Sequence, residues 1–345
     1  MVKIEEPKAS RALPWVERYR PKNVSDVSSQ EAVVSTLLSA IEQKAMPHLL
    51  FYGPPGTGKT SVALALARAL YGPVLYKARI LEMNASDERG IDIVREKIKT
   101  FAQASVGKQS TPGYPCPTFK IIILDEADAM TKDAQAALRR TIENYSKVTR
   151  FCMICNYVSR IIEPLTSRCA KFRFKPFHFD VMHERLQYIA DQEGLTLGEG
   201  ALEAVSQHCG GDMRKAVTLL QSSVRLNGTA VEGEHIAEVA EAVPPGVVNR
   251  FLAVCKQGQF KKIQAEVEEF VQQSYVTGNF LNQLQEKVIG SSLYSDRTKA
   301  QVCDAIARCD AALTLGSTDY AQLIDLGARC GLAIAQKAPC SPLAP

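Results

Sequence analysis

A glycine-rich octapeptide constrains the fold of this chain more than any other segment. It reads Gly-Pro-Pro-Gly-Thr-Gly-Lys-Thr over residues 53–60, after an apolar run at 48–52 and before an apolar helical pattern that begins at Ser61. A strand, a glycine-rich loop and a helix in this order are the context in which the G-x-x-x-x-G-K-[ST] pattern indicates a phosphate-binding loop. The alternative is a glycine-rich turn with a chance lysine, which would not explain the two flanking segments.

The octapeptide offers a nucleotide several kinds of contact. Its glycines let backbone N–H groups close around phosphate oxygens, and the positive end of the following helix points at them. Lys59 can reach the β- and γ-phosphates of ATP, and the hydroxyl of Thr60 can ligate Mg²⁺. The predicted phosphate-binding residues are Gly53, Pro54, Pro55, Gly56, Thr57, Gly58, Lys59, Thr60 and Ser61.

A second apolar run, at 119–124, predicts how the nucleotide is used. It reads as a buried parallel strand and ends in Asp125-Glu126-Ala127-Asp128. A carboxylate at the C-terminal end of such a strand faces the ligand crevice of an open α/β sheet. We therefore expect Asp125 to hold Mg²⁺ and Glu126 to polarise an attacking water. The alternative is a strand that ends in a solvated acidic turn.

The composition is that of a soluble globular chain with two or three domains. It has 345 residues, of which 46% are hydrophobic and 23% are charged. No apolar run approaches the length of a membrane span, and we expect no secretory signal because the N-terminus is charged. The net charge of +4 is too small to indicate nucleic-acid binding, so any DNA contact must come from a local basic face.

Some of the ten cysteines have a spacing that suggests a metal site. Cys152 and Cys155 form a C-x-x-C pair, which Cys116 and Cys169 could complete to a four-ligand zinc site. The pair lies inside an expected strand at 150–155, whose alternation would direct the two sulfurs to opposite faces. Because zinc needs thiolates that converge on one point, buried core thiols in a reducing compartment are the favoured interpretation.

Periodicity predicts an α/β part followed by a helical part. Strands are expected at 48–52, 79–84, 120–124, 150–155 and 171–175, and helices between them at 30–43, 60–71, 90–104 and 132–145. Beyond Pro176 the strand signal ends, and further helices are expected at 180–193, 199–209, 212–226, 247–256, 259–273, 278–289, 297–314 and 318–337. In the helix at 297–314, Val302, Ile306 and Cys309 share one face, which fits either the core of a helix bundle or a subunit interface.

Four further segments and the acidic run at 125–128 follow one another along the chain. They are Leu-Pro-Trp-Val-Glu-Arg-Tyr-Arg-Pro at 13–21, Asn-Ala-Ser-Asp-Glu-Arg-Gly at 84–90, Asp-Glu-Ala-Asp at 125–128, Ser-Arg-Cys at 167–169 and Gly-Asp-Met-Arg-Lys-Ala at 211–216. With these segments the chain resembles the small subunits of eukaryotic replication factor C, the sliding-clamp loader of the AAA+ ATPases, over nearly its whole length. The Ser-Arg-Cys triplet and the segment at 84–90 are far more specific than the phosphate-binding loop.

The resemblance implies a fold, a reaction and a set of partners. The implied fold is an AAA+ Rossmann-like parallel-sheet domain at 13–176, a three-helix lid at 177–240 and an all-helical C-terminal collar at 241–337, between loose tails at 1–12 and 338–345. The implied activity is ATP hydrolysis, with Mg²⁺, in a nuclear heteropentamer that opens the sliding clamp PCNA and loads it on DNA in replication and repair. The implied partners are the large and small replication factor C subunits, PCNA and the backbone phosphates of primer–template DNA, with no membrane.

Three further polar residues have roles that the resemblance implies. Asn156 follows the strand at 150–155, where its amide can hold the attacking water or a γ-phosphate oxygen, as the family residue called sensor 1 does. By resemblance, Arg168 acts in trans in the ATP site of the adjacent subunit, and such an arginine is worth roughly 10³–10⁵ in rate. Arg214, on the lid, would touch the γ-phosphate of the chain's own ATP. A solvated surface arginine is the alternative for both.

The resemblance also implies an adenine pocket and a DNA contact. Val16, Tyr19, Arg20 and Pro21 resemble the segment that lines the pocket, with apolar walls and a guanidinium that can stack on a base. Arg89, Arg95 and Lys99 would track backbone phosphates, which gives sequence-independent and salt-sensitive binding. A plain solvated helix face is the alternative, because residues 87–99 hold as many acidic as basic side chains. Arg139 and Arg140 are weaker candidates, for a link between DNA contact and Glu126.

The main hypothesis is an ATP-driven subunit of a clamp loader, and two other classes compete with it. One is a scaffold that binds ATP with little turnover, and the presence of Asp125, Glu126 and Asn156 argues against it. The other is a different DNA-acting ring ATPase, such as a branch-migration motor. The Ser-Arg-Cys triplet and the long helical C-terminal part favour the clamp loader.

Overall fold

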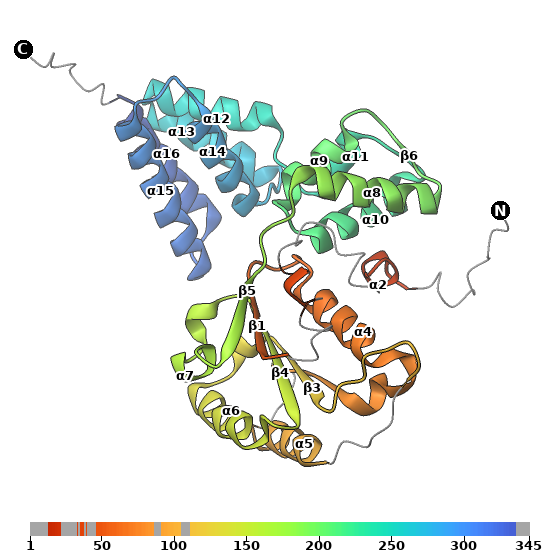
Figure 1. Cartoon of the computed structure of the whole chain (residues 1–345). Helices are drawn as coiled ribbons and strands as arrows, with labels where there is room; N and C mark the ends of the chain where they lie inside the picture. Colours follow the sequence, from red (N-terminus) through yellow and green to blue (C-terminus); the bar gives the residue numbers. More distant parts are fainter. Residues whose placement is uncertain are drawn as a thin grey trace, which may run out of the picture. The chain divides into compact units, whose positions relative to one another are not determined.

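The structure is a computed structural model (Figure 1) that describes residues 13–21, 33, 35–37, 39, 46–85, 91–104 and 111–335, and within these only the backbone of 91–95. The chain forms two compact units, Met1–Ile236 and Ala237–Pro345. The predicted helix at 30–43 and the two predicted tails lie largely or wholly outside the described residues.

A five-stranded sheet forms the centre of the first unit. Its strands lie in the order β2-β3-β4-β1-β5, and every neighbouring pair is parallel. Their bounds are β1 (His48–Tyr52), β2 (Ile80–Asn84), β3 (Lys120–Asp125), β4 (Thr149–Cys155) and β5 (Cys169–Arg173). Strands β3 and β4 are buried along almost their whole length, as expected of parallel strands that are covered on both faces.

All five predicted strands exist, and only β5 is displaced. It was expected at 171–175 but begins and ends two residues earlier. The alternation of basic and apolar residues continues to Lys175, but Tyr52, the last residue of β1, already pairs with Arg173. The ladder therefore ends there, and a single further backbone hydrogen bond joins the Phe174 amide to the Tyr52 carbonyl at 2.8 Å.

Helices pack on both faces of the sheet and separate its core into two clusters. Helix α4 (Lys59–Arg79) packs on one face, and α5 (Ile91–Gln103) and α6 (Lys132–Tyr145) pack on the other. Cys152 belongs to the first cluster and Cys155 to the second, so the expected opposite orientation of the two sulfurs is confirmed. Burial raises the pKa of both thiols, that of Cys155 to about 12, so neither is a thiolate at neutral pH.

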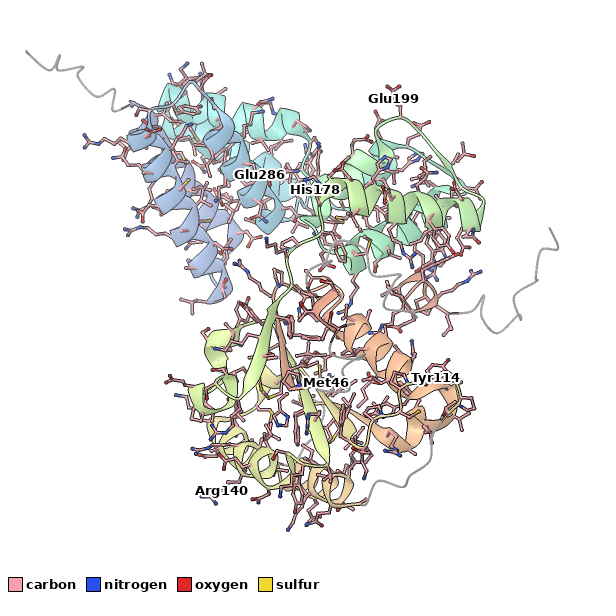
Figure 2. All side chains as sticks on the ribbon, in the orientation of Figure 1. Met46, Tyr114, Arg140, His178, Glu199 and Glu286 are labelled. Atoms are coloured by element: carbon pink, nitrogen blue, oxygen red, sulfur yellow. The ribbon has the colours of Figure 1, made fainter. Side chains whose placement is uncertain are left out.

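Helix α4 continues beyond its predicted end at residue 71. Gly72 has a non-helical backbone with φ of +65°, and Pro73 follows it as the first residue of a resumed helix. The Leu70 carbonyl, next to this break, accepts a hydrogen bond from the Cys116 amide at 3.0 Å. A loop distant in sequence therefore supplies a donor where the helix is interrupted. Tyr114, labelled in Figure 2, covers Gly72 so closely that a Cβ there would lie 2.7 Å from its ring.

The remainder of the first unit is mainly helical and contains four short elements that the periodicity missed. Helices α8 (Phe179–Glu193), α9 (Ala201–Cys209) and α10 (Met213–Asn227) agree closely with prediction, and Asp212 caps α10 by accepting from the Lys215 amide at 3.0 Å. The missed elements are α2 (Trp15–Arg18), β6 (Thr196–Leu197), β7 (Ala230–Val231) and α11 (Gly233–Val239). Each is too short to show a periodic pattern.

Three short turns of helix lie in the connections between the sheet strands. They are η2 (Ala127–Ala129), η3 (Val158–Arg160) and α7 (Glu163–Thr166).

The second unit consists of helices with one apolar core. Helices α12 (Pro245–Gln257), α13 (Phe260–Gln272), α14 (Thr277–Gly290), α15 (Asp296–Thr314) and α16 (Asp319–Ala335) begin and end within two residues of the predicted bounds. Val302, Ile306 and Cys309 are all buried in this core, which decides between the two alternatives in favour of the bundle core.

Across the described parts of the chain, we find no helix whose length and apolar character would allow it to cross a membrane.

Candidate active site

A cleft opens at the carboxyl ends of β1, β3 and β4, within the first unit. The sheet side is formed by the glycine-rich loop, the start of α4 and the residues that follow β3 and β4. The opposite side is formed by the α2 segment and by side chains of α8 and α10. All predicted nucleotide-binding residues line this cleft except Gly53 and Pro54, which lie at the base of the loop, and Glu126 lines it as well.

The loop after β1 has a backbone that only glycine accommodates at two positions. Gly53 has φ of +147°, and a Cβ there would lie 2.2 Å from the Phe174 carbonyl oxygen. Gly56 has φ of +66°, and a Cβ there would lie 1.7 Å from Asp212 Oδ1. The loop therefore packs directly against Phe174, the residue after β5, and against Asp212 at the start of α10.

Lys59 links the loop to the end of β4. Its ammonium donates hydrogen bonds to the carbonyls of Gly53 and Pro54, both at 2.7 Å, and to Asn156 Oδ1 at 3.0 Å. Only 7% of the residue is exposed, and this burial lowers the pKa of Lys59, although the nearby Asp125 carboxylate opposes the shift. Two of the predicted residues, Lys59 and Asn156, are thus in direct contact although 97 positions separate them.

Thr60 and Asp125 present oxygen atoms side by side. The Thr60 hydroxyl donates to Asp125 Oδ2 at 2.7 Å, and Asp125 Oδ1 accepts from the Glu126 amide at 2.9 Å. Hydroxyl, carboxylate and phosphate oxygens are the hard ligands that Mg²⁺ prefers. This donor set therefore fits the metal that accompanies a nucleoside triphosphate.

Glu126 has a left-handed backbone, with φ of 53° and ψ of 38°, which is uncommon for a residue other than glycine. Such a conformation costs of order 1–3 kcal/mol and is concentrated at functional sites. The side chain is exposed at the cleft, where a carboxylate can accept a proton from water.

Asp128 is a site residue for which the sequence analysis assigned no role. Its Oδ2 accepts hydrogen bonds from the amides of Asn156 and Tyr157, both at 3.1 Å. It therefore fixes the backbone at the end of β4, from which the Asn156 side chain projects. The only sequence signal was its place as the last acidic residue of the run that begins at Asp125.

The lid helices complete the cleft with the predicted Arg214 and with several residues that the sequence analysis did not identify. From α8, Arg185 donates to the Tyr19 carbonyl at 2.7 Å and so holds the α2 segment. From the other side of that segment, Arg20 Nε donates to the Ser61 hydroxyl at 3.3 Å. Arg214 lines the cleft on α10 and is exposed. Apolar residues from the lid side also line the cleft, namely Phe177, Val181, Ile189, Met213 and Val217.

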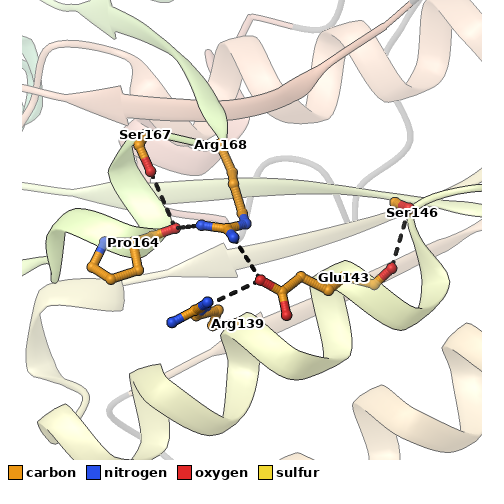
Figure 3. Close-up of polar contacts among 6 residues, drawn as sticks. All are labelled: Arg139, Glu143, Ser146, Pro164, Ser167 and Arg168. Carbon is orange, nitrogen blue, oxygen red and sulfur yellow. Dashed lines mark hydrogen bonds and ion pairs between the residues drawn. The ribbon is translucent and has the colours of Figure 1, made fainter.

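Arg168 does not line this cleft. It follows α7, and its guanidinium contacts the Pro164 carbonyl and the Glu143 carboxylate of α6 (Figure 3). Its location outside the chain's own cleft is compatible with a role in trans, which stays a prediction.

The predicted DNA contacts are only partly within the described residues. Lys99 is exposed on α5, whereas Arg89 and the side chain of Arg95 lie outside what the structure describes. Arg139 pairs with Glu143 at 3.0 Å, and Arg140 points outward from α6 (Figure 2).

Three sequence families match the chain in succession. Residues 49–177 match the ATPase family associated with various cellular activities (AAA), residues 184–225 match the RCF1/5-like AAA+ ATPase lid domain, and residues 243–329 match the replication factor C C-terminal domain. The fold and the cleft, together with these matches, define an ATPase of the AAA class that binds nucleotide.

Relatives identify the family within that class. Replication factor C subunit 4 of Arabidopsis thaliana is 50% identical over 96% of this chain and 98% of its own length. Replication factor C subunit 2 of Oryza sativa is 50% identical over 93% of this chain and 94% of its own length. Human replication factor C subunit 4 is 48% identical over 93% of this chain and 88% of its own length. The chain therefore belongs to the replication factor C family of small subunits.

Solved structures confirm the fold. RuvB from Thermotoga maritima, described as a Holliday junction branch migration motor, matches with a TM-score of 0.50 over 77% of this chain and 91% of its own. A T158V variant of RuvB matches with a TM-score of 0.51. At 17% sequence identity this likeness concerns the AAA+ fold alone, so it gives no support to the branch-migration alternative.

Proposed function

We propose that this chain is an ATPase subunit of the heteropentameric clamp loader that opens the PCNA sliding clamp and places it on primer–template DNA. Relatives that carry the replication factor C name at 45–50% identity support this proposal. The observation that carries it is the convergence of Lys59, Thr60, Asp125, Glu126 and Asn156 on one cleft. We further propose the domain limits 13–176, 177–240 and 241–337, and a nuclear location.

In this proposal ATP binds with its phosphates in the glycine-rich loop and its base toward the α2 segment. Lys59 would exchange its contacts with the Gly53 and Pro54 carbonyls for phosphate oxygens, which offer a buried ammonium a stronger partner. Val16 and Tyr19 would contact the adenine, and Arg214 would reach the γ-phosphate from the lid. Mg²⁺, held by Thr60 and Asp125, would neutralise charge on the phosphates.

Hydrolysis would then depend on the residues at the ends of β3 and β4. Glu126 would accept a proton from the attacking water, because it is an exposed carboxylate at the cleft. Asn156 would orient that water or a γ-phosphate oxygen through its side-chain amide. Asp128 would keep Asn156 in place by holding its backbone amide.

Arg168 would supply a positive charge to the ATP site of the adjacent subunit. An arginine that reaches into the neighbouring subunit stabilises the charge on the transferred phosphoryl group and makes hydrolysis depend on assembly. Lys99, with Arg89 and Arg95, would contact DNA phosphates inside the ring and make binding salt-dependent.

The proposal is tested with the complex formed by this chain, the four related subunits and PCNA. We expect the assembled complex to load PCNA on primed DNA only with Mg²⁺ and ATP. Lys59→Ala should abolish ATP binding by this chain, and Glu126→Gln should retain binding but lose hydrolysis at this site. If Glu126→Gln changes neither hydrolysis nor loading, the chain acts as an ATP-binding scaffold, and if the native complex lacks PCNA, the clamp-loader function is wrong.

A further inference from the structure

A cluster of two arginines and one carboxylate lies outside the cleft and joins two distant segments of the sheet domain (Figure 3). Glu143, near the end of α6, accepts on Oε1 from Arg168 Nη2 at 2.6 Å and from Arg139 Nε at 3.0 Å. Arg168 Nη1 also donates to the Pro164 carbonyl of α7 at 2.6 Å. The Arg168 side chain is thus held at two points although 35% of it is exposed.

These contacts leave Arg168 able to bind a further anion. A guanidinium has five N–H donors in a fixed plane, and the two observed bonds use one from each terminal nitrogen. Within the described part of the chain, three donors remain, and the partial exposure of the side chain lets an incoming phosphate approach the guanidinium. The Ser167 hydroxyl shares the Pro164 carbonyl at 3.4 Å, so the turn that carries Arg168 is itself fixed.

The charges of the cluster keep it attractive to phosphate. Two guanidinium groups and one carboxylate leave a net charge of +1, so Glu143 does not cancel the field of Arg168. The hydrogen bond from Arg139 is the main factor that lowers the pKa of Glu143, with Arg168 adding to it, so the carboxylate stays ionised at neutral pH. Arg139 and Arg168 donate to the same atom, Glu143 Oε1. Glu143 is therefore shared between two guanidinium groups and does not pair with Arg168 alone.

We propose that Glu143 is a positioning residue that pre-orders Arg168 for the triphosphate bound by an adjacent subunit, an inference that rests on the proposed trans role of Arg168. A free arginine side chain loses rotamer entropy when it is fixed. Glu143 and the Pro164 carbonyl impose that order before the subunits meet, so less freedom is lost on engagement. The opposite interpretation is a latch, in which Glu143 withholds Arg168 from the neighbour.

The experiment uses the full five-subunit complex and compares Glu143→Ala, Glu143→Gln and Arg168→Ala. ATP hydrolysis is followed in a single turnover with primed DNA and PCNA. A change at the adjacent ATP site is then seen as a change in the amplitude or the rate of the fast phase of hydrolysis. We expect Arg168→Ala to slow that site by at least 10³-fold, since it removes the charge itself. Glu143→Ala should slow it about tenfold to a hundredfold, as expected when a catalytic group is misplaced, and Glu143→Gln less, because its amide oxygen still accepts one bond.

Two measurements separate positioning from general damage to the fold. ATP binding by this chain's own cleft should be unchanged in the Glu143 variants, and adding Glu143→Ala to Arg168→Ala should cause no further loss. Asp133→Asn is the matched control, because it removes another exposed carboxylate of α6 that forms no ion pair with the rest of the described chain. It should leave the rate unchanged.

Each alternative result has a distinct meaning. If Arg168→Ala has no effect, the proposed trans role is wrong. If Arg168→Ala slows hydrolysis but both Glu143 variants match the unmodified complex, only the positioning role is wrong. Faster hydrolysis in Glu143→Ala would establish the latch and overturn positioning. A loss that adds fully to that of Arg168→Ala would also overturn positioning, because Glu143 would then act independently of Arg168.

Discussion

Asp128 holds Asn156 by its backbone rather than by its side chain: the carboxylate accepts the Asn156 amide at 3.1 Å and leaves the side-chain amide to contact Lys59. A second bond, from the Tyr157 amide at 3.1 Å, fixes the direction in which the chain leaves β4. The run of acidic residues after β3 therefore supports the neighbouring strand end as well as supplying Asp125 and Glu126 to the cleft.

Replacing Asp128 should reduce hydrolysis far more than nucleotide binding. Asp128→Ala leaves two backbone amides without their acceptor and lets Asn156 move, and we expect kcat to fall about tenfold to a hundredfold. The affinity for ATP should change less than about threefold, because the glycine-rich loop is untouched. Asp128→Asn, which keeps one acceptor oxygen, should lose less activity. Equal losses in kcat and in affinity would contradict this division of roles, and steady-state kinetics with equilibrium ATP titration measure both.

Gly56→Ala should separate the glycine-rich loop from the start of α10. The new Cβ would lie 1.7 Å from Asp212 Oδ1, and φ is +66°. We expect a loss of at least about tenfold in ATP affinity, in addition to a destabilisation of roughly 1–2 kcal/mol from the left-handed backbone. Gly194→Ala is the control, because φ there is +69° and, apart from its chain neighbours, no described residue comes within 4 Å of the new Cβ. It should show the destabilisation without the loss of affinity.

Lys59→Met should remove the thermal stabilisation that nucleotide provides. A ligand at one hundred times its Kd stabilises the folded state by about 2.7 kcal/mol, so Mg²⁺ and ATP should raise the Tm of the unmodified chain. The variant loses the ammonium that bridges the loop carbonyls and Asn156, and its Tm should not respond. A full Tm shift in Lys59→Met would show that this lysine does not bind the triphosphate. Arg140→Met, at an exposed position that points away from the sheet, should keep the shift (Figure 2).

His48 should make the chain sensitive to mild acid. Burial, with a contribution from Arg150, lowers the pKa of His48 from 6.5 to about 4, and its Nδ1 accepts the Phe151 amide at 3.1 Å. Between these two pH values the unfolded chain binds more protons at His48 than the folded chain does. The contribution of His48 to the free energy of unfolding is therefore complete above pH 6.5 and is lost as the pH falls toward 4. In His48→Asn, whose amide oxygen can replace Nδ1, urea unfolding at pH 7 and pH 5 should show a smaller decline. His178→Asn, at an exposed histidine, should decline as the unmodified chain does.

The local parts of the fold and site followed from the sequence, and the long-range parts did not. The strands and the glycine-rich loop have short-range patterns, so β1 and β3 were predicted closely, and the loop lies between β1 and α4 as expected. Helix α2 was missed because four residues show no period, although it lies at the cleft through Trp15 and Val16. The contact between Arg168 and Glu143 joins positions 25 residues apart on different elements, and no spacing rule connects them.

The contact between Asp212 and Gly56 joins the glycine-rich loop to the start of α10, the helix that also carries Arg214. A hydrogen bond from the Met213 amide to the Gly56 carbonyl at 3.3 Å reinforces the same joint. Because the loop contacts the first residues of α10, a shift of the loop on nucleotide binding would be passed to this helix. We therefore expect the position of α10 to differ between the triphosphate-bound and the product-bound subunit.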